Sequence, residues 1–143
     1  MNRIVDLIRE VHPRHRLGNS DVSGHTKSAQ RITKEWQKAV QSDSVKAEVP
    51  VSPTNNEKID IVDFINKTAY ELKVSGKNVH HEFFKDVFKV LTFNEYQEVN
   101  ERLGKLVFIS EQSGINSLRG RLDVKLVALL QERHELEIEL VGI

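Results

Sequence analysis

The stretch KIDIVDFINKTAYELKVS, residues 58–75, decides the expected fold of this chain. Two runs rich in β-branched and aromatic residues flank a short polar turn at residues 66–68, a pattern typical of an antiparallel β-hairpin. Along the first run, alternation predicts Ile59 and Ile61 on one face of the strand. Asp60 then lies on the opposite face.

The second run places an acid and a base side by side. Glu71 and Lys73 are two positions apart on the predicted strand, so they share one of its faces. If the two strands pair around the turn, Asp60 approaches Glu71 from the neighbouring strand. Converging carboxylates repel each other, and a divalent cation removes that repulsion. Oxygen ligands of this kind suit Mg²⁺ or Mn²⁺, and Lys73 then lies where it can orient an attacking water.

Helical and alternating patterns surround the hairpin. We expect helices at residues 2–11, 26–40 (capped by Thr26), 78–91 and 115–133, and further strands at 46–52, 105–110 and 134–143. In the helix over 78–91, the predicted inward residues are Phe84, Val87, Phe88 and Leu91. A hairpin combined with strands that are reached across helices predicts an α/β fold whose mixed central sheet is flanked by helices.

The length of 143 residues fits one domain with a sizeable core. We expect it to comprise an N-terminal helix and polar basic loop (1–25), a helix-strand core (26–110), and a C-terminal helix and strand (111–143). With no cysteine, the chain has no disulfide, no thiolate zinc site and no cysteine nucleophile. No apolar run is long enough to span a membrane, and the start does not resemble a signal peptide, so we expect a cytoplasmic protein.

The charge balance bears on possible partners. The 21 basic and 21 acidic side chains give a net charge of zero, which argues against non-specific coating of nucleic acid. It does not argue against a nuclease, because acids that bind a metal leave basic residues free elsewhere.

The hairpin resembles the core of the PD-(D/E)XK nuclease superfamily, which has the restriction-endonuclease-like fold. The family pattern is an Asp on one strand, a short spacer, and Glu-x-Lys on the next strand. Asp60, Glu71 and Lys73 match this pattern, and the expected order of elements over residues 26–110 agrees with the family core. One departure is Ile59, which stands where the pattern has a proline.

The resemblance implies a Mg²⁺-dependent endonuclease that hydrolyses phosphodiester bonds in DNA, with Mn²⁺ as a substitute. By resemblance, Asp60, Glu71 and the backbone carbonyl of Leu72 bind the metal, and Lys73 serves the attacking water. Members of the superfamily often have a further acid on the first core helix. Glu35 is the acid available on the expected helix, and Gln30 is the alternative; a solvated Glu35 fits the sequence equally well.

Two regions are expected to contact DNA. Lys77 and His80 lie at the start of the helix after the hairpin, where a helix N-terminus can face a phosphate. Arg14 and Arg16 lie in the basic, polar stretch 12–27, which can act as an arm that orders on a DNA groove or simply as a polar connector.

Other functions remain open at this stage. The Glu–Lys pair also fits an ordinary solvated strand face, where such ion pairs contribute about 0–1 kcal/mol. A catalytically inactive nucleic-acid-binding or scaffold subunit of a larger nucleic-acid-processing or defence complex, and a nuclease that acts on RNA, are the alternatives. Because one domain of this size encloses little of a duplex, we expect a homodimer formed through the C-terminal strand or the Phe-rich helix.

Overall fold

In the computed structural model of the chain, residues 2–16, 22–75 and 77–143 are described, and of residues 22–26 only the backbone. The helices are α1 (Arg3–His15), α2 (Val22–Val40), α3 (Val79–Glu95), α4 (Gln112–Arg121) and α5 (Val124–His134), with a 3-10 turn at Val99–Glu101. The strands are β1 (Val45–Pro50), β2 (Lys58–Asp63), β3 (Thr68–Lys73), β4 (Lys105–Ser110) and β5 (Glu137–Gly142).

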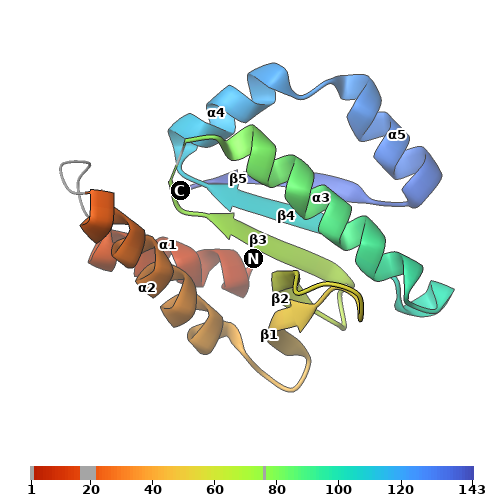
Figure 1. Ribbon diagram of the computed structural model, residues 1–143, viewed down its shortest axis with the longest axis horizontal. Coiled ribbons are helices and arrows are strands. Elements are labelled where there is room, and N and C mark those ends of the chain that lie inside the picture. Colours follow the sequence, from red (N-terminus) through yellow and green to blue (C-terminus); the bar gives the residue numbers. More distant parts are fainter. Residues whose placement is uncertain (1, 17–21, 76) are drawn as a thin grey trace.

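The strands form one sheet whose spatial order follows the sequence, β1-β2-β3-β4-β5. Neighbouring strands are antiparallel from β1 to β3 and parallel from β3 to β5. The predicted hairpin is confirmed as β2 and β3, with Ile61 opposite Tyr70 and Asp63 opposite Thr68. The described part of the chain is therefore a mixed α/β protein with a mixed sheet. Its parallel strands all end at one edge of the sheet (Figure 1).

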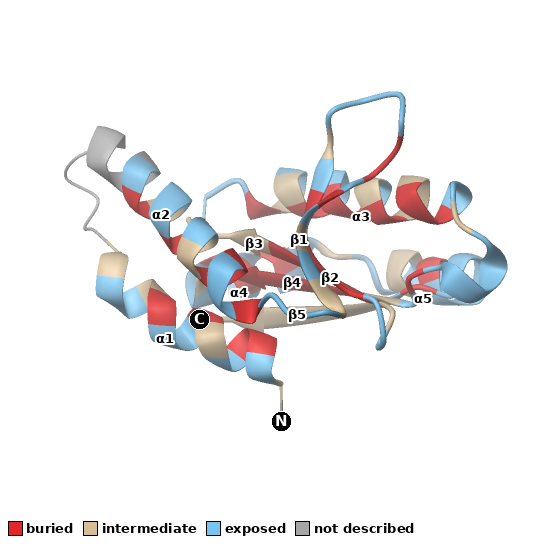
Figure 2. Ribbon diagram, turned by 90° about the horizontal axis from the view of Figure 1, so that it is seen from below, coloured by how far each residue is buried: buried red, intermediate tan, exposed pale blue. Residues whose placement is uncertain are grey.

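Helices cover both faces of this sheet (Figure 1). Under α3, α4 and α5, a first buried cluster includes Phe83 and Phe108, and under α1 and α2 a second includes Ile8 and Trp36. The indole N–H of Trp36 donates to the carbonyl oxygen of Ile4 at 2.9 Å, which ties α2 to α1. Figure 2 shows buried residues along the sides of the helices that face the strands. None of the described helices is long and apolar enough to cross a membrane.

The pair β1–β2 changes faces at one register position. Alternate residues of a regular strand share a face, yet Ile59 belongs to the first cluster and Ile61 to the second. The change falls at Asp60 and at Glu48, which the register of β1 with β2 places opposite it. Glu48 has φ 50°, a left-handed conformation that is uncommon outside glycine. The prediction that Ile59 and Ile61 share a face was wrong because the backbone departs from regular geometry between them.

The helix α3 turns a different side to the sheet from the one predicted. Phe83 is fully buried, whereas Phe84 is 39% exposed and Phe88 is 69% exposed. The side of α3 that faces the sheet also carries Asp86 and Lys89, whose charged groups pair with each other at 3.2 Å. Lys89 in turn contacts groups of β2 and β3. These polar contacts accompany a rotation of α3 that leaves Phe84 and Phe88 outside, so their prediction as inward residues was wrong.

The N-terminal helices are longer than predicted. α1 continues through Pro13 to His15, so the first part of the expected polar loop is helical. Pro13 lies in the last turn, where the hydrogen bond that a proline deletes costs little of the helix, and the buried Val11 just before it holds α1 in place. α2 begins at Val22, four residues before the predicted cap Thr26. The boundary expected between residues 25 and 26 therefore falls inside a helix.

The C-terminal part also differs in detail. The single helix expected over 115–133 is two helices, α4 and α5. They separate because Asp123 acts as the N-cap of α5, and its carboxylate accepts the N–H of Lys125 at 2.7 Å. The expected strands at 105–110 and at the end of the sequence are confirmed as β4 and β5.

Candidate functional site

The strands β2 and β3 stop pairing in the usual way just beyond Ile61 and Tyr70. There, the backbone N–H of Asp60 donates to Glu71 Oε1 at 2.5 Å, and the backbone N–H of Leu72 donates to Asp60 Oδ2 at 2.9 Å. Each carboxylate thus accepts a hydrogen bond from the opposite strand. The structure brings Asp60 and Glu71 together, as the sequence predicted.

The backbone of Asp60 is held from a second side. Gln37, on α2, donates its amide N–H to the carbonyl oxygen of Asp60 at 3.0 Å. Both backbone polar groups of Asp60 therefore bond to side chains, which is how the strand departs from regular pairing without leaving them unsatisfied. Glu48 lies across from this point on β1 with its left-handed backbone. Strained backbone of this kind is frequent at functional sites.

The carboxyl group of Glu71 is buried against α3. Glu71 is 1% exposed, and its Oε2 forms an ion pair with Lys89. Lys89 Nζ also lies 3.2 Å from Asp86 Oδ1 and donates to the carbonyl oxygen of Lys58 at 2.7 Å. Glu71 thereby links the end of the hairpin to α3.

Burial raises the pKa values of Asp60 and Glu71. Desolvation raises the pKa of Asp60 from 3.8 to about 6, although the N–H of Leu72 and the charge of Lys89 act in the opposite direction. Desolvation also raises the pKa of Glu71 well above its ordinary value, and the neighbouring Asp86 and Asp60 raise it further. Ionising either of these two carboxyl groups in the folded protein therefore costs more free energy than it does in water.

A cavity of about 370 Å³ opens on the other side of this point, between α2 and the sheet. Asp60 and Lys73 both line it, so the structure brings these two predicted residues to one cavity. The cavity is also lined by polar residues (Gln30, Thr33, Lys34, Gln37, Glu48 and Ser75) and by the apolar Ala29, Leu72 and Val74. Glu71 is not among the lining residues. Asp60 thus lies between the cavity and the buried Glu71.

The two candidates on α2 lie apart. Gln30 lines the cavity with Asp60 and Lys73. Glu35 instead pairs with His15 at 2.7 Å, and this hydrogen bond lowers its pKa. The structure therefore places Gln30, and not Glu35, beside the predicted site.

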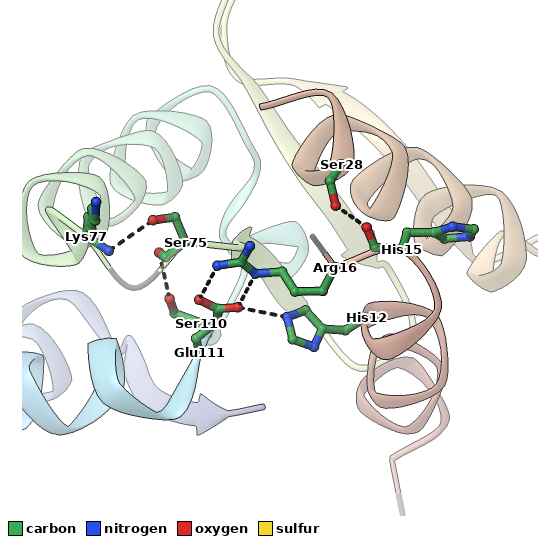
Figure 3. Close-up of polar contacts among 8 residues, drawn as sticks. All are labelled: His12, His15, Arg16, Ser28, Ser75, Lys77, Ser110 and Glu111. Carbon is green, nitrogen blue, oxygen red and sulfur yellow. Dashed lines mark hydrogen bonds and ion pairs between the residues drawn. The ribbon is translucent and has the colours of Figure 1, made fainter. Parts of the chain in front are cut away.

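The predicted DNA contacts fall in two regions. Arg16 forms a two-pronged ion pair with Glu111, through Nε at 2.5 Å and Nη2 at 3.2 Å, and His12 Nε2 lies 3.0 Å from the same carboxylate (Figure 3). These contacts tie the end of α1 to the start of α4. Arg14 is exposed in the last turn of α1. Residues 17–21 of the proposed arm lie outside the described residues.

The second region is the start of α3. The backbone N–H of Lys77 donates to Ser75 Oγ at 3.2 Å, next to the cavity (Figure 3). His80 stacks on His81 with ring centroids 4.0 Å apart, and its Nε2 lies 3.4 Å from a guanidinium nitrogen of Arg121. Desolvation, with the nearby His81 and Arg121, lowers the pKa of His80. Lys77 and His80 therefore lie near the edge of the sheet that bears Lys73.

Sequence reasoning missed Asp86 and Lys89. Both are charged residues three positions apart in a helix whose other inward residues, apart from Asn94, are apolar. A charged pair on the apolar side of a helix indicates a buried polar partner, since unpaired charges are almost never buried. That signal depends on knowing which side of α3 faces the sheet, and apolar spacing favoured the side that carries Phe84 and Phe88. Glu48 and Gln37 offered no such signal, because both occupy positions typical of a solvated strand or helix.

The carboxylate and carbonyl oxygens of this site are of the kind that bind a divalent cation. Among the described residues, no three His, Cys, Asp or Glu side chains converge to hold a metal on their own. Mg²⁺, however, commonly binds through one or two carboxylates and several waters. Asp60 and Glu71 supply adjacent carboxylates, and burial, which raises the pKa of both, disfavours the negative charge that such a cation would neutralise. The carbonyl of Leu72 lies on the same side of β3 as its N–H, which faces Asp60.

In comparisons with known proteins, no family model matches the chain, and no curated protein or solved structure does so either.

Proposed function

We propose that this chain is a metal-dependent nuclease that hydrolyses phosphodiester bonds in DNA and has the restriction-endonuclease-like fold. The observation that carries the proposal is the exchange of hydrogen bonds between Asp60 and the Glu71 strand where β2 and β3 part. Lys73 lies two residues further along β3 and lines the same cavity as Asp60. The resemblance of this Asp and Glu-x-Lys set to the PD-(D/E)XK pattern supports the same conclusion.

Each residue has its own task in the proposed reaction. A bound Mg²⁺ or Mn²⁺ supplies stabilisation of the charge on the scissile phosphate. Asp60, Glu71 and the carbonyl of Leu72 hold that cation, and the N–H of Leu72 keeps the carboxylate of Asp60 in place. Lys73 donates a hydrogen bond from the wall of the cavity to the attacking water or to a phosphate oxygen.

The surroundings of the cavity suit a phosphodiester backbone. Lys34 lines the cavity on α2, and Lys77 follows β3 at the same edge. Amide and ammonium groups of this kind donate to phosphate oxygens and position a nucleic-acid strand. We extend the proposal to a homodimer, because one domain of this size contacts only a short length of duplex.

A cleavage assay tests the proposal. Purified protein is incubated with supercoiled, linear, single-stranded and branched DNA, and with RNA, in Mg²⁺, in Mn²⁺ or in chelator. We expect metal-dependent cleavage of DNA that Lys73→Ala and Asp60→Asn each slow by about 100-fold or more. Lys46→Ala is the matched control, because Lys46 is exposed on β1 and does not line the cavity. Absence of cleavage in every combination, or full activity of Lys73→Ala, would contradict the proposal.

A second candidate function is a catalytically inactive nucleic-acid-binding or scaffold subunit of the same fold. The contact between Lys89 and Glu71 favours it, because a carboxylate that is 1% exposed and paired with an ammonium serves structure without any metal. Fluorescence anisotropy with labelled DNA separates the two functions. Binding by the parent without cleavage, and equal binding by Lys73→Ala, would support the inactive subunit.

A further inference from the structure

Lys89 is a largely buried ammonium whose partners are all oxygen atoms. Its side chain is 11% exposed. Its Nζ contacts Glu71 Oε2, lies 3.2 Å from Asp86 Oδ1, and donates to the carbonyl oxygen of Lys58 at 2.7 Å. These three acceptors match the three N–H groups of an ammonium. Oxygen atoms are also the ligands that Mg²⁺ and Mn²⁺ prefer.

The ammonium and a metal would need the same oxygen. One oxygen of Glu71, Oε1, accepts the N–H of Asp60, and the other, Oε2, is paired with Lys89. Both carboxylate oxygens of Glu71 are therefore in use within the protein. Each of these oxygens has a second lone pair, but a divalent cation on Glu71 Oε2 would lie beside the ammonium of Lys89, and two positive charges in a buried place repel each other. The ammonium is the partner on a flexible side chain, so it is the partner that can move away.

The charges around Lys89 are not balanced by its own charge. Asp60, Glu71 and Asp86 influence one another electrostatically, and Lys89 contacts two of these three acids. Burial favours the neutral amine, yet the charges of Glu71 and Asp86 outweigh it and raise the pKa of Lys89. A single ammonium therefore serves two contacting acids, Glu71 and Asp86.

We propose that Lys89 is the resident cation of the candidate site, and that a divalent cation binds Glu71 by displacing its ammonium. This inference rests on the proposed function for the location of the metal, but it does not depend on whether the protein cleaves DNA. Lys89 sets the metal affinity of the site: it stabilises the metal-free protein and makes the cation compete for Glu71. It is a positioning residue that acts through Glu71.

Replacing the ammonium with a neutral chain of similar length tests this role. In Lys89→Met we expect the dissociation constant for Mn²⁺, measured by calorimetry on the whole chain, to fall about tenfold or more, since removing a close charge contact shifts an equilibrium at least that far. In chelator, Lys89→Met should melt below the parent, and Mn²⁺ should restore much of the difference. A merely structural lysine would lower the melting temperature equally with and without Mn²⁺.

Two controls locate the effect. Lys85→Met removes an ammonium from the same helix that lies 3.7 Å from Glu57 and is half exposed, so it should leave Mn²⁺ binding unchanged. Adding Glu71→Gln to Lys89→Met should abolish the gain in Mn²⁺ affinity. Lys89→Gln provides a second variant, which retains a donor for the carbonyl of Lys58 and should show the same direction of change.

Unchanged or weaker Mn²⁺ binding in both Lys89 variants would overturn the inference. Failure of both to fold even in Mn²⁺ would overturn it as well, because it would show that a divalent cation does not take the place of the ammonium. These outcomes are distinct from failure of the proposed function. A chain that cuts no DNA but gains Mn²⁺ affinity in Lys89→Met leaves the inference standing, whereas an active nuclease without that gain refutes the inference alone.

Discussion

Glu71 and Glu111 lie near the ends of the neighbouring parallel strands β3 and β4, yet their positively charged partners and their pKa shifts differ. Glu111 follows β4, is partly exposed, and has its own partners in the guanidinium of Arg16 and the ring of His12. Burial opposes its charge, but these two partners outweigh burial and lower its pKa. Glu71 lies under α3 and shares its ammonium with Asp86. Its pKa is raised.

The difference separates two uses of an ion pair. At Glu111 the guanidinium of Arg16 matches the charge of the acid, and the result is a tie between α1 and the start of α4 (Figure 3). At Glu71 several acids share one contacting ammonium in a place that water reaches poorly. Structural ties are expected to satisfy their charges, whereas acids held at a cost are frequent in sites that bind or react. This contrast, rather than the number of acids, identifies the end of the hairpin as the candidate site.

Removing each acid should give the largest contrast. Glu71→Ala leaves the N–H of Asp60 and the ammonium of Lys89 buried without a main partner, so we expect the free energy of unfolding to fall by about 3–5 kcal/mol. Glu111→Ala breaks a partly exposed pair and should cost about 1 kcal/mol or less. Guanidinium unfolding monitored by the fluorescence of Trp36 measures both.

Salt provides a control for that comparison. Both variants are unfolded in urea with and without about 1 M NaCl. The loss of unfolding free energy in Glu111→Ala should shrink in the salt, because ions screen exposed charges. The loss in Glu71→Ala should persist, because its charges are buried. Equal losses for the two variants, or equal sensitivity to salt, would show that the two acids do not differ in the way described.

The pH dependence of stability should differ in sign. The pKa of Asp60 rises from 3.8 to about 6 on folding, so the folded state binds its proton more tightly, and stability falls as pH rises through this range. The full loss is at most about 3 kcal/mol. The pKa of Glu111 is lowered, so its contribution is present above its ordinary pKa and is lost as pH falls through the folded value.

Neutral variants test these two signs. Between about pH 4 and about pH 6, Asp60→Asn should lose less stability with rising pH than the parent does. Glu111→Gln should lose less stability than the parent on acidification. Urea unfolding midpoints over a pH series measure both, and a slope in Asp60→Asn identical to that of the parent would rule out Asp60 as the titrating group.

The sequence predicted the parts of the site that depend on local pairing. The turn expected at residues 66–68 lies at 64–67 in the structure, where it places Asp60 opposite Glu71, because antiparallel register follows from the position of the turn. The alternation that predicted Glu71 and Lys73 on one face is equally local, but in the structure Glu71 contacts α3 whereas Lys73 lines the cavity beside α2. The mixed sheet also followed from local signals, since a hairpin and strands reached across helices leave few topologies.

The parts that were missed depend on how helices rotate against the sheet. Whether Gln30 or Glu35 reaches the cavity depends on the orientation of α2, which the bond from Trp36 to Ile4 helps to fix. The approach of Lys89 to Glu71 likewise depends on the rotation of α3, and apolar spacing alone favoured a rotation with Phe84 and Phe88 inside. Tertiary contacts of this kind leave no strict period in the sequence.

Of the substitutions considered, Lys73→Ala is expected to have the smallest effect on stability. Comparing Lys73 with Lys89 shows which lysine is available for function. Lys89 and Lys73 are two lysines near the same acids, but among the described residues the ammonium of Lys89 has three oxygen partners, whereas the ammonium of Lys73 has no hydrogen bond or ion pair, and Lys73 lines a cavity. Lys73→Ala should therefore change the free energy of unfolding by about 0.5 kcal/mol or less, measured by guanidinium unfolding beside the cleavage assay. A side chain that folding does not use, in a residue that lines a cavity together with the buried acid Asp60, is available for a ligand. If Lys73→Ala instead destabilised the protein as much as Glu71→Ala, Lys73 would belong to the internal charge cluster, and the proposed task of serving the attacking water would lose its structural basis.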